Sequence, residues 1–333
     1  MLLAVVAEGA TAAIAMNQPQ HHVDGGFRNL APIERPGPSV TIPFLFRRLS
    51  GLWRSRPGAA PRVPNDGALL RENARHSAST VTWIGHSTLL VQMDHVTFLT
   101  DPIWSETPSP TALVGPPRFV PPGLGLEALP PIDFVVISHN HYDHLDLPTL
   151  HRLAATGTRF LVPLRVGELL RSEGINDVEE LDWWESRRLA DVEVHCVPSQ
   201  HWSGRGLTDQ RATLWAGWAV IGPTRRFYYA GDTGYFTGFR EIGARLGPFG
   251  LAALPIGAYE PKAMMRAVHL NPEEALQAGS DVRAERIIGV HYGTFDLSDE
   301  PLDEPPRRFR AEADRRGVGD QSWTPPIGEI RFW

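Results

Sequence analysis

Residues 138–146 read Ser138-His139-Asn140-His141-Tyr142-Asp143-His144-Leu145-Asp146, and the prediction of the fold starts from this stretch. It follows residues 132–137, an apolar run broken by a single aspartate, which is short and β-branched enough to form a buried strand. A buried strand that ends abruptly in imidazoles and a carboxylate is hard to explain by packing. Imidazole nitrogen and carboxylate oxygen are the donors that zinc, iron and manganese accept.

The spacing inside this stretch predicts ligands for two adjacent metals. In an extended chain His139 and His141 point the same way, because side chains repeat every second residue. The turn that follows lets Asp143 and His144 face a second point nearby. The alternative is a polar loop that happens to be rich in histidine.

Length and composition exclude several classes of protein. The chain has 333 residues, 42% of them hydrophobic, and a formal net charge of -6, which allows one large domain or two small ones with an ample core. A single cysteine excludes a disulfide framework and a cysteine-rich zinc site. The acidic balance argues against a nucleic-acid partner, and no apolar run approaches the ~20 residues that a membrane span needs.

The chain divides into three predicted parts. Residues 1–16 are expected to be a leader; they lack the opening positive charge of a secretory signal, and Glu8 interrupts their apolar part. A disordered leader, or a segment upstream of a true translation start at Met16, is therefore favoured over an export signal. A cytoplasmic location with membrane association is expected. Residues 17–75, rich in proline, glycine and arginine, are expected to pack as an extension on a main domain of residues 76–333.

One segment of the extension has a helical pattern. In residues 42–54, apolar residues occupy one face and arginines mostly the other. It is interpreted either as a short helix packed on the main domain or as an interfacial segment that touches anionic lipid. In the second interpretation the contact runs over residues 44–56, with apolar and basic contributions from Phe44, Leu45, Phe46, Leu49, Trp53, Arg47, Arg48, Arg54 and Arg56.

From residue 81 the pattern becomes regular and indicates an α/β domain. Strands come first and are then mixed with helices, and this order occurs twice. Helices are expected near Pro148, through Leu170, and after Asn271, where an asparagine cap, a proline and two acids mark a helix start. The strands are predicted at residues 81–84, 88–92, 96–100, 132–137, 160–164, 191–197, 214–221, 226–230, 251–256 and 286–290.

Three further strand ends carry isolated donors, at His201, Asp232 and His291. Together with the run from His139 to His144, they resemble the metallo-β-lactamase fold, whose signature is His-x-His-x-Asp-His followed by His, Asp and His. The resemblance covers roughly residues 76–333 and implies a four-layer αββα sandwich, with two facing mixed sheets and a dinuclear metal site along one edge.

Smaller motifs resemble the N-acyl-phosphatidylethanolamine-hydrolysing phospholipase D branch of that fold. The resemblance implies a zinc-dependent phosphodiesterase that acts on a phospholipid such as N-acyl-phosphatidylethanolamine. The motifs are Trp83-Ile84-Gly85-His86-Ser87-Thr88, Phe98-Leu99-Thr100-Asp101-Pro102, Pro198-Ser199-Gln200-His201-Trp202, His269-Leu270-Asn271-Pro272-Glu273-Glu274 and, in the extension, His21-His22-Val23-Asp24-Gly25-Gly26-Phe27-Arg28-Asn29.

The resemblance also assigns the ligands of two zinc ions, for which iron or manganese are alternatives. It implies that a hydroxide between the two metals is the nucleophile, since metals lower the pKa of bound water. It places His139, His141 and His201 on one metal, Asp143, His144 and His291 on the other, and Asp232 between them.

Three other residues have two interpretations each, and a fourth is assigned by the resemblance. Asp101 is expected to orient a ligand histidine, with a simple turn former as the alternative. Asp146 shares that supporting role, or it caps the helix near Pro148. His86 lines the site or is a satisfied core histidine. His269 resembles a histidine that contacts substrate, and we count it with Asp143 as catalytic.

Two other functions compete with the phosphodiesterase. The same dinuclear site is suited to hydrolysing a lactone or another small ester. The third hypothesis is a metal-binding scaffold without turnover, which the complete set of expected ligands makes the weakest of the three.

Overall fold

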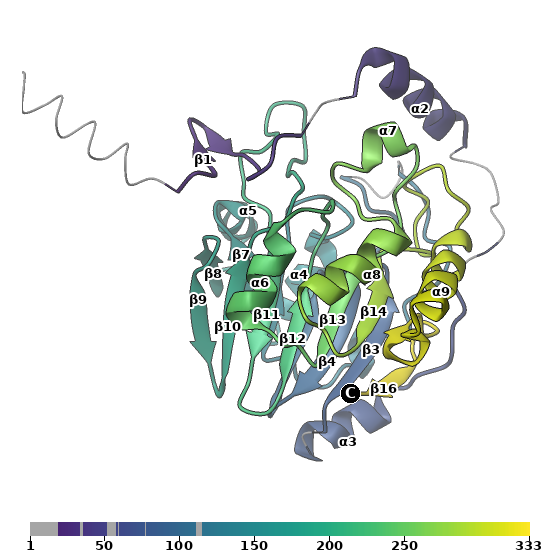
Figure 1. Ribbon diagram of the computed structural model, residues 1–333. Coiled ribbons are helices and arrows are strands. Elements are labelled where there is room, and N and C mark those ends of the chain that lie inside the picture. Colours follow the sequence, from purple (N-terminus) through teal and green to yellow (C-terminus); the bar gives the residue numbers. More distant parts are fainter. Residues whose placement is uncertain (1–18, 34–35, 52–57, 59, 77, 111–114) are drawn as a thin grey trace, which may run out of the picture.

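The computed structural model describes residues 19–33, 36–51, 58, 60–76, 78–110 and 115–333 (Figure 1). The predicted leader, residues 1–16, lies outside the described residues. Within the described part, no helix combines the length and the apolar character that crossing a membrane requires.

Two seven-stranded sheets form the centre of the molecule (Figure 1). The first sheet consists, in spatial order, of β16 (Ile330–Phe332), β3 (Thr80–Gly85), β4 (Thr88–Met93), β5 (Val96–Thr100), β6 (Phe134–Val136), β7 (Arg159–Pro163) and β8 (Val178–Leu181). The second consists of β15 (Ser322–Trp323), β14 (Ile287–Val290), β13 (Leu251–Pro255), β12 (Arg226–Tyr229), β11 (Gly217–Ile221), β10 (Val192–Val197) and β9 (Ser186–Leu189).

Each sheet is antiparallel in one half and parallel in the other. In the first sheet the pairs from β16 to β5 are antiparallel and those from β5 to β8 are parallel. In the second sheet the pairs from β9 to β12 are antiparallel and those from β12 to β15 are parallel. Parallel neighbours need a crossover, and the crossovers in both sheets carry most of the helices.

Helices cover the outer face of each sheet (Figure 1). Against the first sheet lie α3 (Ala68–His76), α4 (Leu147–Ala154) and α5 (Val166–Ser172). Against the second lie α6 (Gly238–Leu246), α8 (Pro272–Asp281) and α9 (Glu304–Arg316). The remaining elements are β1 (His22–Val23), β2 (Gly26–Phe27), α2 (Pro38–Gly51), α7 (Lys262–Met265) and the 3-10 helices η1 (Leu126–Ala128) and η2 (Gly319–Gln321).

The alternation of side chains explains the four layers. In β4, Leu89 and Val91 enter the core between the sheets, whereas Leu90 enters the core beneath α3, α4 and α5. Because both faces of the sheet are covered in this way, β4 and β5 are buried along their whole length. The predicted αββα sandwich is confirmed.

The predicted helix start at Asn271 is present. The side chain of Asn271 accepts from the Glu274 backbone N–H at 2.8 Å, and the Glu274 side chain accepts from the Asn271 N–H at 3.3 Å. This capping box satisfies two backbone donors that the first turn leaves unpaired, and it fixes the first turn of α8.

The predicted helical segment of the extension differs in detail. Helix α2 spans Pro38–Gly51, so it begins before residue 42, and residues 52–57 lie outside the described residues. Among the side chains of α2 that the structure describes, Phe44 is buried at 6% exposure and Leu45 is 54% exposed, and the helix contacts α7.

Candidate metal centre

The predicted ligands come from four strand ends that meet along one edge of the two sheets. The residues from His139 to His144 follow β6 of the first sheet, whereas His201, Asp232 and His291 follow β10, β12 and β14 of the second. Strands β10 and β12 run in the same direction because each is antiparallel to β11. Their carboxyl ends therefore open at the same edge, and the structure brings all seven predicted ligands together there.

Three histidines form the first group. The His141 Nδ1 atom lies 2.8 Å from the Nε2 atom of His139 and 3.3 Å from the Nε2 atom of His201. Residues 139–141 supply two of these nitrogens because alternate side chains of an extended segment share a direction. The third comes from a loop 60 residues further along the chain.

A carboxylate and two histidines form the second group. The Asp143 Oδ2 atom lies 3.3 Å from the Nε2 atom of His144 and 3.5 Å from the Nε2 atom of His291. The turn begun at His141, whose carbonyl accepts from the N–H of His144 at 3.1 Å, directs this half of the segment away from the first group.

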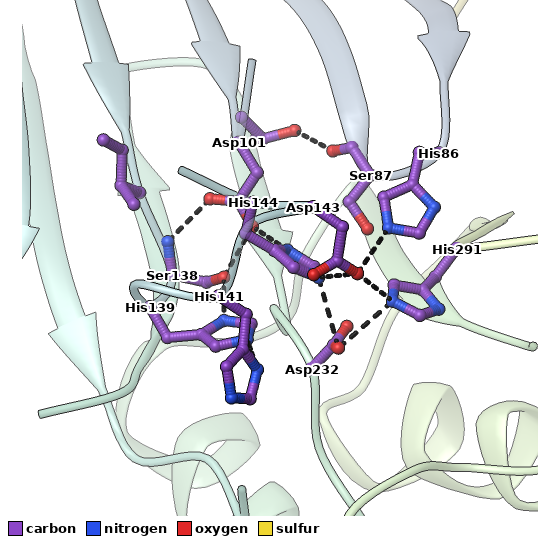
Figure 2. A network of polar contacts seen from close by, with 12 residues as sticks. His86, Ser87, Asp101, Ser138, His139, His141, Asp143, His144, Asp232 and His291 are labelled. Carbon is purple, nitrogen blue, oxygen red and sulfur yellow. Dashed lines mark hydrogen bonds and ion pairs between the residues drawn. The ribbon is translucent and has the colours of Figure 1, made fainter. Parts of the chain in front are cut away.

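Asp232 lies between the two groups. Its Oδ2 atom is 3.2 Å from the Nε2 atom of His144, 3.1 Å from that of His291 and 3.8 Å from that of His201. Both Asp143 and Asp232 point toward the rings of His144 and His291 (Figure 2).

This donor set fits divalent metal ions. The Nε2 atoms of His144 and His291 and the Oδ1 atom of Asp232 are buried, and none of the described residues gives them a hydrogen-bond partner. Buried polar atoms are normally paired, so atoms left free at one point indicate a missing ligand. Nitrogen and oxygen donors without a thiolate are compatible with zinc, iron or manganese.

Burial keeps most of the histidines neutral. It lowers the pKa of His141 and of His269 to about 4, and the pKa of His86 to about 3. Burial likewise holds the pKa of His139 and His201 well below the ordinary histidine value. A neutral imidazole keeps the lone pair with which it binds a metal.

The pKa of two other histidines is raised instead of lowered. Burial alone would lower the pKa of His144 and His291, but the neighbouring carboxylates of Asp232 and Asp143 outweigh it. The pKa of His291 rises to about 9, and that of His144 rises well above its ordinary value. The paired carboxylates therefore draw positive charge to this position, and a bound cation would supply the same charge.

Asp101 lies at the back of the ligand segment, where we expected it to orient a histidine. Its carboxylate is fully buried and accepts from the Nδ1 atom of His144 at 2.6 Å and from the Ser138 backbone N–H at 2.6 Å. It also accepts from the hydroxyls of Ser138 and Tyr229. The Ser138 hydroxyl in turn lies 2.8 Å from the Nδ1 atom of His139, so Asp101 touches one ligand candidate directly and another through Ser138.

His86 lies behind Asp143. Its Nε2 atom is 3.0 Å from the Oδ2 atom of Asp143, and its ring centroid is 4.2 Å from that of His291. The backbone of His86 accepts from the N–H of His291 at 3.0 Å. His86 is therefore a buried neighbour of the centre that holds a ligand candidate from behind.

Asp146 does not support the centre, and that interpretation of its role is wrong. Its carboxylate accepts from the backbone N–H groups of Trp104 and Ser105, and from the hydroxyls of Ser105 and Thr149. These contacts tie the loop after β5 to the first turn of α4. The other interpretation was that Asp146 caps the helix: it occupies the N-cap position before Leu147, but its side chain makes no capping hydrogen bond to the helix backbone and accepts instead from the Thr149 hydroxyl.

An open cavity of about 540 Å³ leads to the centre. His269 lines it, with its Nδ1 atom 3.9 Å from the Oδ2 atom of Asp232. Trp202 forms another part of the wall and packs edge-on against His141 with a centroid distance of 4.3 Å. Apolar lining comes from Ile33, Pro36, Met264, Met265, Val268 and Leu297.

Sequence reasoning missed the partners that come from other elements. Ser138 belongs to the quoted stretch, but its bridge between Asp101 and His139 depends on a neighbouring strand. Tyr229, the last residue of β12, lies within a predicted strand and belongs to none of the motifs quoted from the sequence. The fixed packing of the two sheets brings these side chains together, and no local motif marks them.

Comparisons with known proteins agree with this geometry. Residues 96–292 match the family model described as "Beta-lactamase superfamily domain". The chain belongs to the beta-lactamase superfamily, and it is a metal-dependent hydrolase of that fold. A metallo hydrolase from the archaeon Ignicoccus hospitalis superposes with a TM-score of 0.59 at 23% identity, over 77% of this chain and 99% of that one.

Relatives of higher sequence identity show which branch of the superfamily the chain is similar to. N-acyl-phosphatidylethanolamine-hydrolyzing phospholipase D 1 of Caenorhabditis elegans is 43% identical over 272 residues, which are 77% of this chain and 76% of that protein. An uncharacterized protein of Mycobacterium tuberculosis is 43% identical over 326 residues, 95% of this chain and 85% of the relative. Both resemblances drawn from the sequence are thereby confirmed.

Proposed function

We propose that this chain is a zinc-dependent phosphodiesterase of the phospholipase D type that hydrolyses N-acyl-phosphatidylethanolamine or a closely similar phospholipid. The observation that carries the proposal is the apolar cavity that leads to seven converging metal-ligand candidates. The relative of 43% identity that bears this activity in its name supports the choice of substrate.

The cavity supports a lipid substrate in two ways. Its volume of about 540 Å³ falls in the range of ~300–1,000 Å³ that small-molecule sites occupy. Its lining combines ligand candidates such as Asp232 and His291 with methionine, valine and isoleucine side chains, and Thr41, Gln210 and Arg211 also line it. A phosphodiester attached to an acyl chain likewise combines a charged head with an apolar tail.

The proposed ligands are His139, His141 and His201 for one metal and Asp143, His144 and His291 for the other, with Asp232 shared. When bound, two divalent cations lower the pKa of water and neutralise the charge of a phosphodiester and of its leaving oxygen. The protein keeps the ligands oriented: Asp101 fixes His144 through its Nδ1 atom, and His86 fixes Asp143. Outer partners of this kind determine which nitrogen faces the metal.

His269 is proposed to contact the substrate. It is 12% exposed, faces the cavity, and remains neutral at physiological pH because burial lowers its pKa to about 4. A neutral imidazole beside Asp232 can donate one hydrogen bond to a phosphate oxygen without adding a charge. We therefore assign His269 to orienting the phosphodiester, while Asp143 serves the reaction as a ligand candidate.

A membrane contact is proposed at α2. Ile42 and Phe46 are exposed by 65% and 73%, and Thr41 on the same helix lines the cavity. Of the arginines predicted to meet head groups, Arg47 is half-exposed and pairs with Asp299 at 2.6 Å. Arg54 and Arg56 lie outside the described residues. Among the side chains that the structure describes, the proposed contact is mainly apolar, and its helix lines the cavity at Thr41.

The experiment compares three substrate classes with the zinc-loaded protein. Vesicles that contain N-acyl-phosphatidylethanolamine should yield N-acylethanolamine and phosphatidic acid, and Asp232→Ala should abolish the reaction. Hydrolysis of a lactone, with no reaction on the phospholipid, would contradict the proposal. Metal binding without turnover of any of the three, including a generic soluble phosphodiester, would contradict it as well.

A further inference from the structure

The side chain of Asn29 connects the amino-terminal segment to the backbone of a ligand candidate. Its Nδ2 atom donates to the carbonyl oxygen of His201 at 2.7 Å, and its Oδ1 atom accepts from the backbone N–H of His201 at 3.1 Å. The same oxygen accepts from the indole Nε1 of Trp215 at 3.0 Å. One carboxamide therefore holds both peptide groups of a proposed metal ligand that lies 172 residues further along the chain.

His201 needs this support because it lies in no strand or helix. It follows the end of β10 at Val197, in a loop without regular structure. The ligand candidates His139 and His141 also lie beyond the end of their strand, but there Asp101 holds the backbone N–H of the preceding Ser138 at 2.6 Å. The ring of His201 is fixed on its far side, where its Nδ1 atom lies 3.0 Å from the carbonyl oxygen of Val268. The Asn29 contacts fix the backbone from which that ring projects.

Asn29 is itself held in place by the hairpin that precedes it. The Phe27 N–H donates to the carbonyl of Arg211 at 2.9 Å, and the Arg28 N–H closes the hairpin on His21 at 2.8 Å. At Gly26 the hairpin approaches so closely that a Cβ atom would lie 2.2 Å from the carbonyl oxygen of Arg211. The close approach leaves room only for glycine there and sets the depth at which the hairpin sits.

The hairpin has a second anchor at Asp182, just beyond the end of β8. The Nε2 atoms of His21 and His22 lie 2.6 Å and 2.8 Å from the two different oxygens of this carboxylate. The ring of His21 also stacks on Trp183 with a centroid distance of 4.2 Å. Each imidazole has its own carboxylate oxygen at hydrogen-bond distance, so the two contacts together hold the hairpin against the end of β8.

We propose that Asn29 is a positioning residue for the metal centre, and that the extension therefore belongs to the functional unit of the hydrolase. Asn29 holds the backbone of His201 so that its Nε2 atom remains directed at the position shared with His139 and His141. The inference rests on the proposed assignment of His201 as a ligand. Of the two metal positions, the one formed by these three histidines should depend on Asn29.

The test measures how two metal ions are released to a competing chelator. Asn29→Ala should release the first equivalent about 10–100-fold more readily than the wild type, which is the effect typical of outer partners of a ligand. The second equivalent should follow the wild-type curve. In a cobalt-loaded sample, the visible absorption of one of the two ions should change.

Asn65→Ala is the matched control. Asn65 is also half-buried, and its carboxamide likewise bridges two backbone groups, donating to the Gly328 carbonyl at 2.7 Å and accepting from the Gly67 N–H at 2.8 Å. It does not touch the centre, so its variant should lose thermal stability yet keep both metals as the wild type does. If Asn29→Ala does not fold, Asn29→Asp replaces only the donor to His201 and should show the same selective release.

Two results would overturn the inference. One is an Asn29 variant that holds both metals as tightly as the wild type or as Asn65→Ala. The other is a wild type that binds no metal at the three histidines. A wild type that binds two metals but cleaves no phospholipid would instead contradict the proposed function and leave the role of Asn29 standing.

Discussion

Replacing Asp101 with Asn should weaken metal binding without removing a ligand. The carboxylate of Asp101 is fully buried and accepts four hydrogen bonds: one from the Ser138 N–H on Oδ1, and three on Oδ2 from the Ser138 hydroxyl, the Tyr229 hydroxyl and the His144 ring. A carboxamide has one accepting oxygen and one NH2 group. Whichever way it turns, at least one buried donor must face the NH2 group.

The size of the effect follows from two independent estimates. A buried donor or acceptor left without a partner costs roughly 1–3 kcal/mol. Losing an outer partner of a metal ligand typically costs ~10–100-fold in affinity or activity, and each factor of ten is worth about 1.4 kcal/mol. The two ranges agree, so Asp101→Asn should lower metal affinity about 10–100-fold. The variant should bind metal better than Asp232→Ala, because it retains every ligand.

The assay is a chelator titration of the zinc-loaded proteins, with Asp146→Asn as the control. Asp146 is also buried, and its carboxylate also accepts four hydrogen bonds, yet it touches no ligand candidate. Asp146→Asn should therefore lower the melting temperature while its zinc titration matches the wild type. Equal zinc retention in Asp101→Asn and Asp146→Asn would refute the reasoning and make Asp101 a simple turn former.

Three further predictions concern other parts of the site. Asp232→Ala should reduce metal content at both positions, because this carboxylate lies within 3.8 Å of nitrogens from both groups; two retained zinc equivalents with full activity, measured by metal analysis and a phosphodiester assay, would disprove the shared position. His269→Ala should keep both metals and lower turnover roughly 10–100-fold, because a hydrogen bond to a charged group is worth about 1.5–3 kcal/mol and each factor of ten is about 1.4 kcal/mol, whereas loss of metal would make His269 a ligand. The double variant Leu45→Ser/Phe46→Ser should fold normally, because both side chains are more than half exposed. It should co-sediment less with phospholipid vesicles and cleave a small soluble phosphodiester at the wild-type rate. Unchanged co-sedimentation would show that the membrane contact does not lie at α2.

The strands were largely predictable because turn residues mark their ends. The two predicted strands at residues 81–84 and 88–92 correspond to β3 and β4, Thr80–Gly85 and Thr88–Met93, which Gly85 and the turn at Asp94 delimit. Apolar runs of this length bounded by such residues have few alternatives to a buried strand.

Elements without an apolar pattern were missed. Strand β9, Ser186–Leu189, carries two arginines and lies exposed at the edge of its sheet, so its sequence has no alternation to detect. Helix α9, Glu304–Arg316, is highly charged and buries few side chains, among them Phe309 and Ala313 four residues apart. Such a narrow contact with the body gives a weak periodic signal, although the spacing of these two residues is helical.

In the candidate site, too, residues marked by a local sequence pattern were predictable and residues brought in by packing were not. The ligand candidates were predictable because four of them lie within six residues and the rest follow apolar strands. The partners that orient them were less accessible: Asp101 was anticipated at a strand end, whereas Tyr229 and Asn29 act across 128 and 172 residues of chain. Those contacts depend on how the two sheets and the extension pack, and neighbouring residues in the sequence do not encode them.

Hydrolysis of N-acyl-phosphatidylethanolamine in heavy-oxygen water tests the central claim most directly. Attack of water at phosphorus forms the new bond to the phosphate and breaks its bond to the ethanolamide oxygen. The zinc-loaded protein should therefore yield phosphatidic acid that carries one heavy oxygen, together with unlabelled N-acylethanolamine. Label in a released fatty acid, or no cleavage by a protein that holds two metals, would contradict the account.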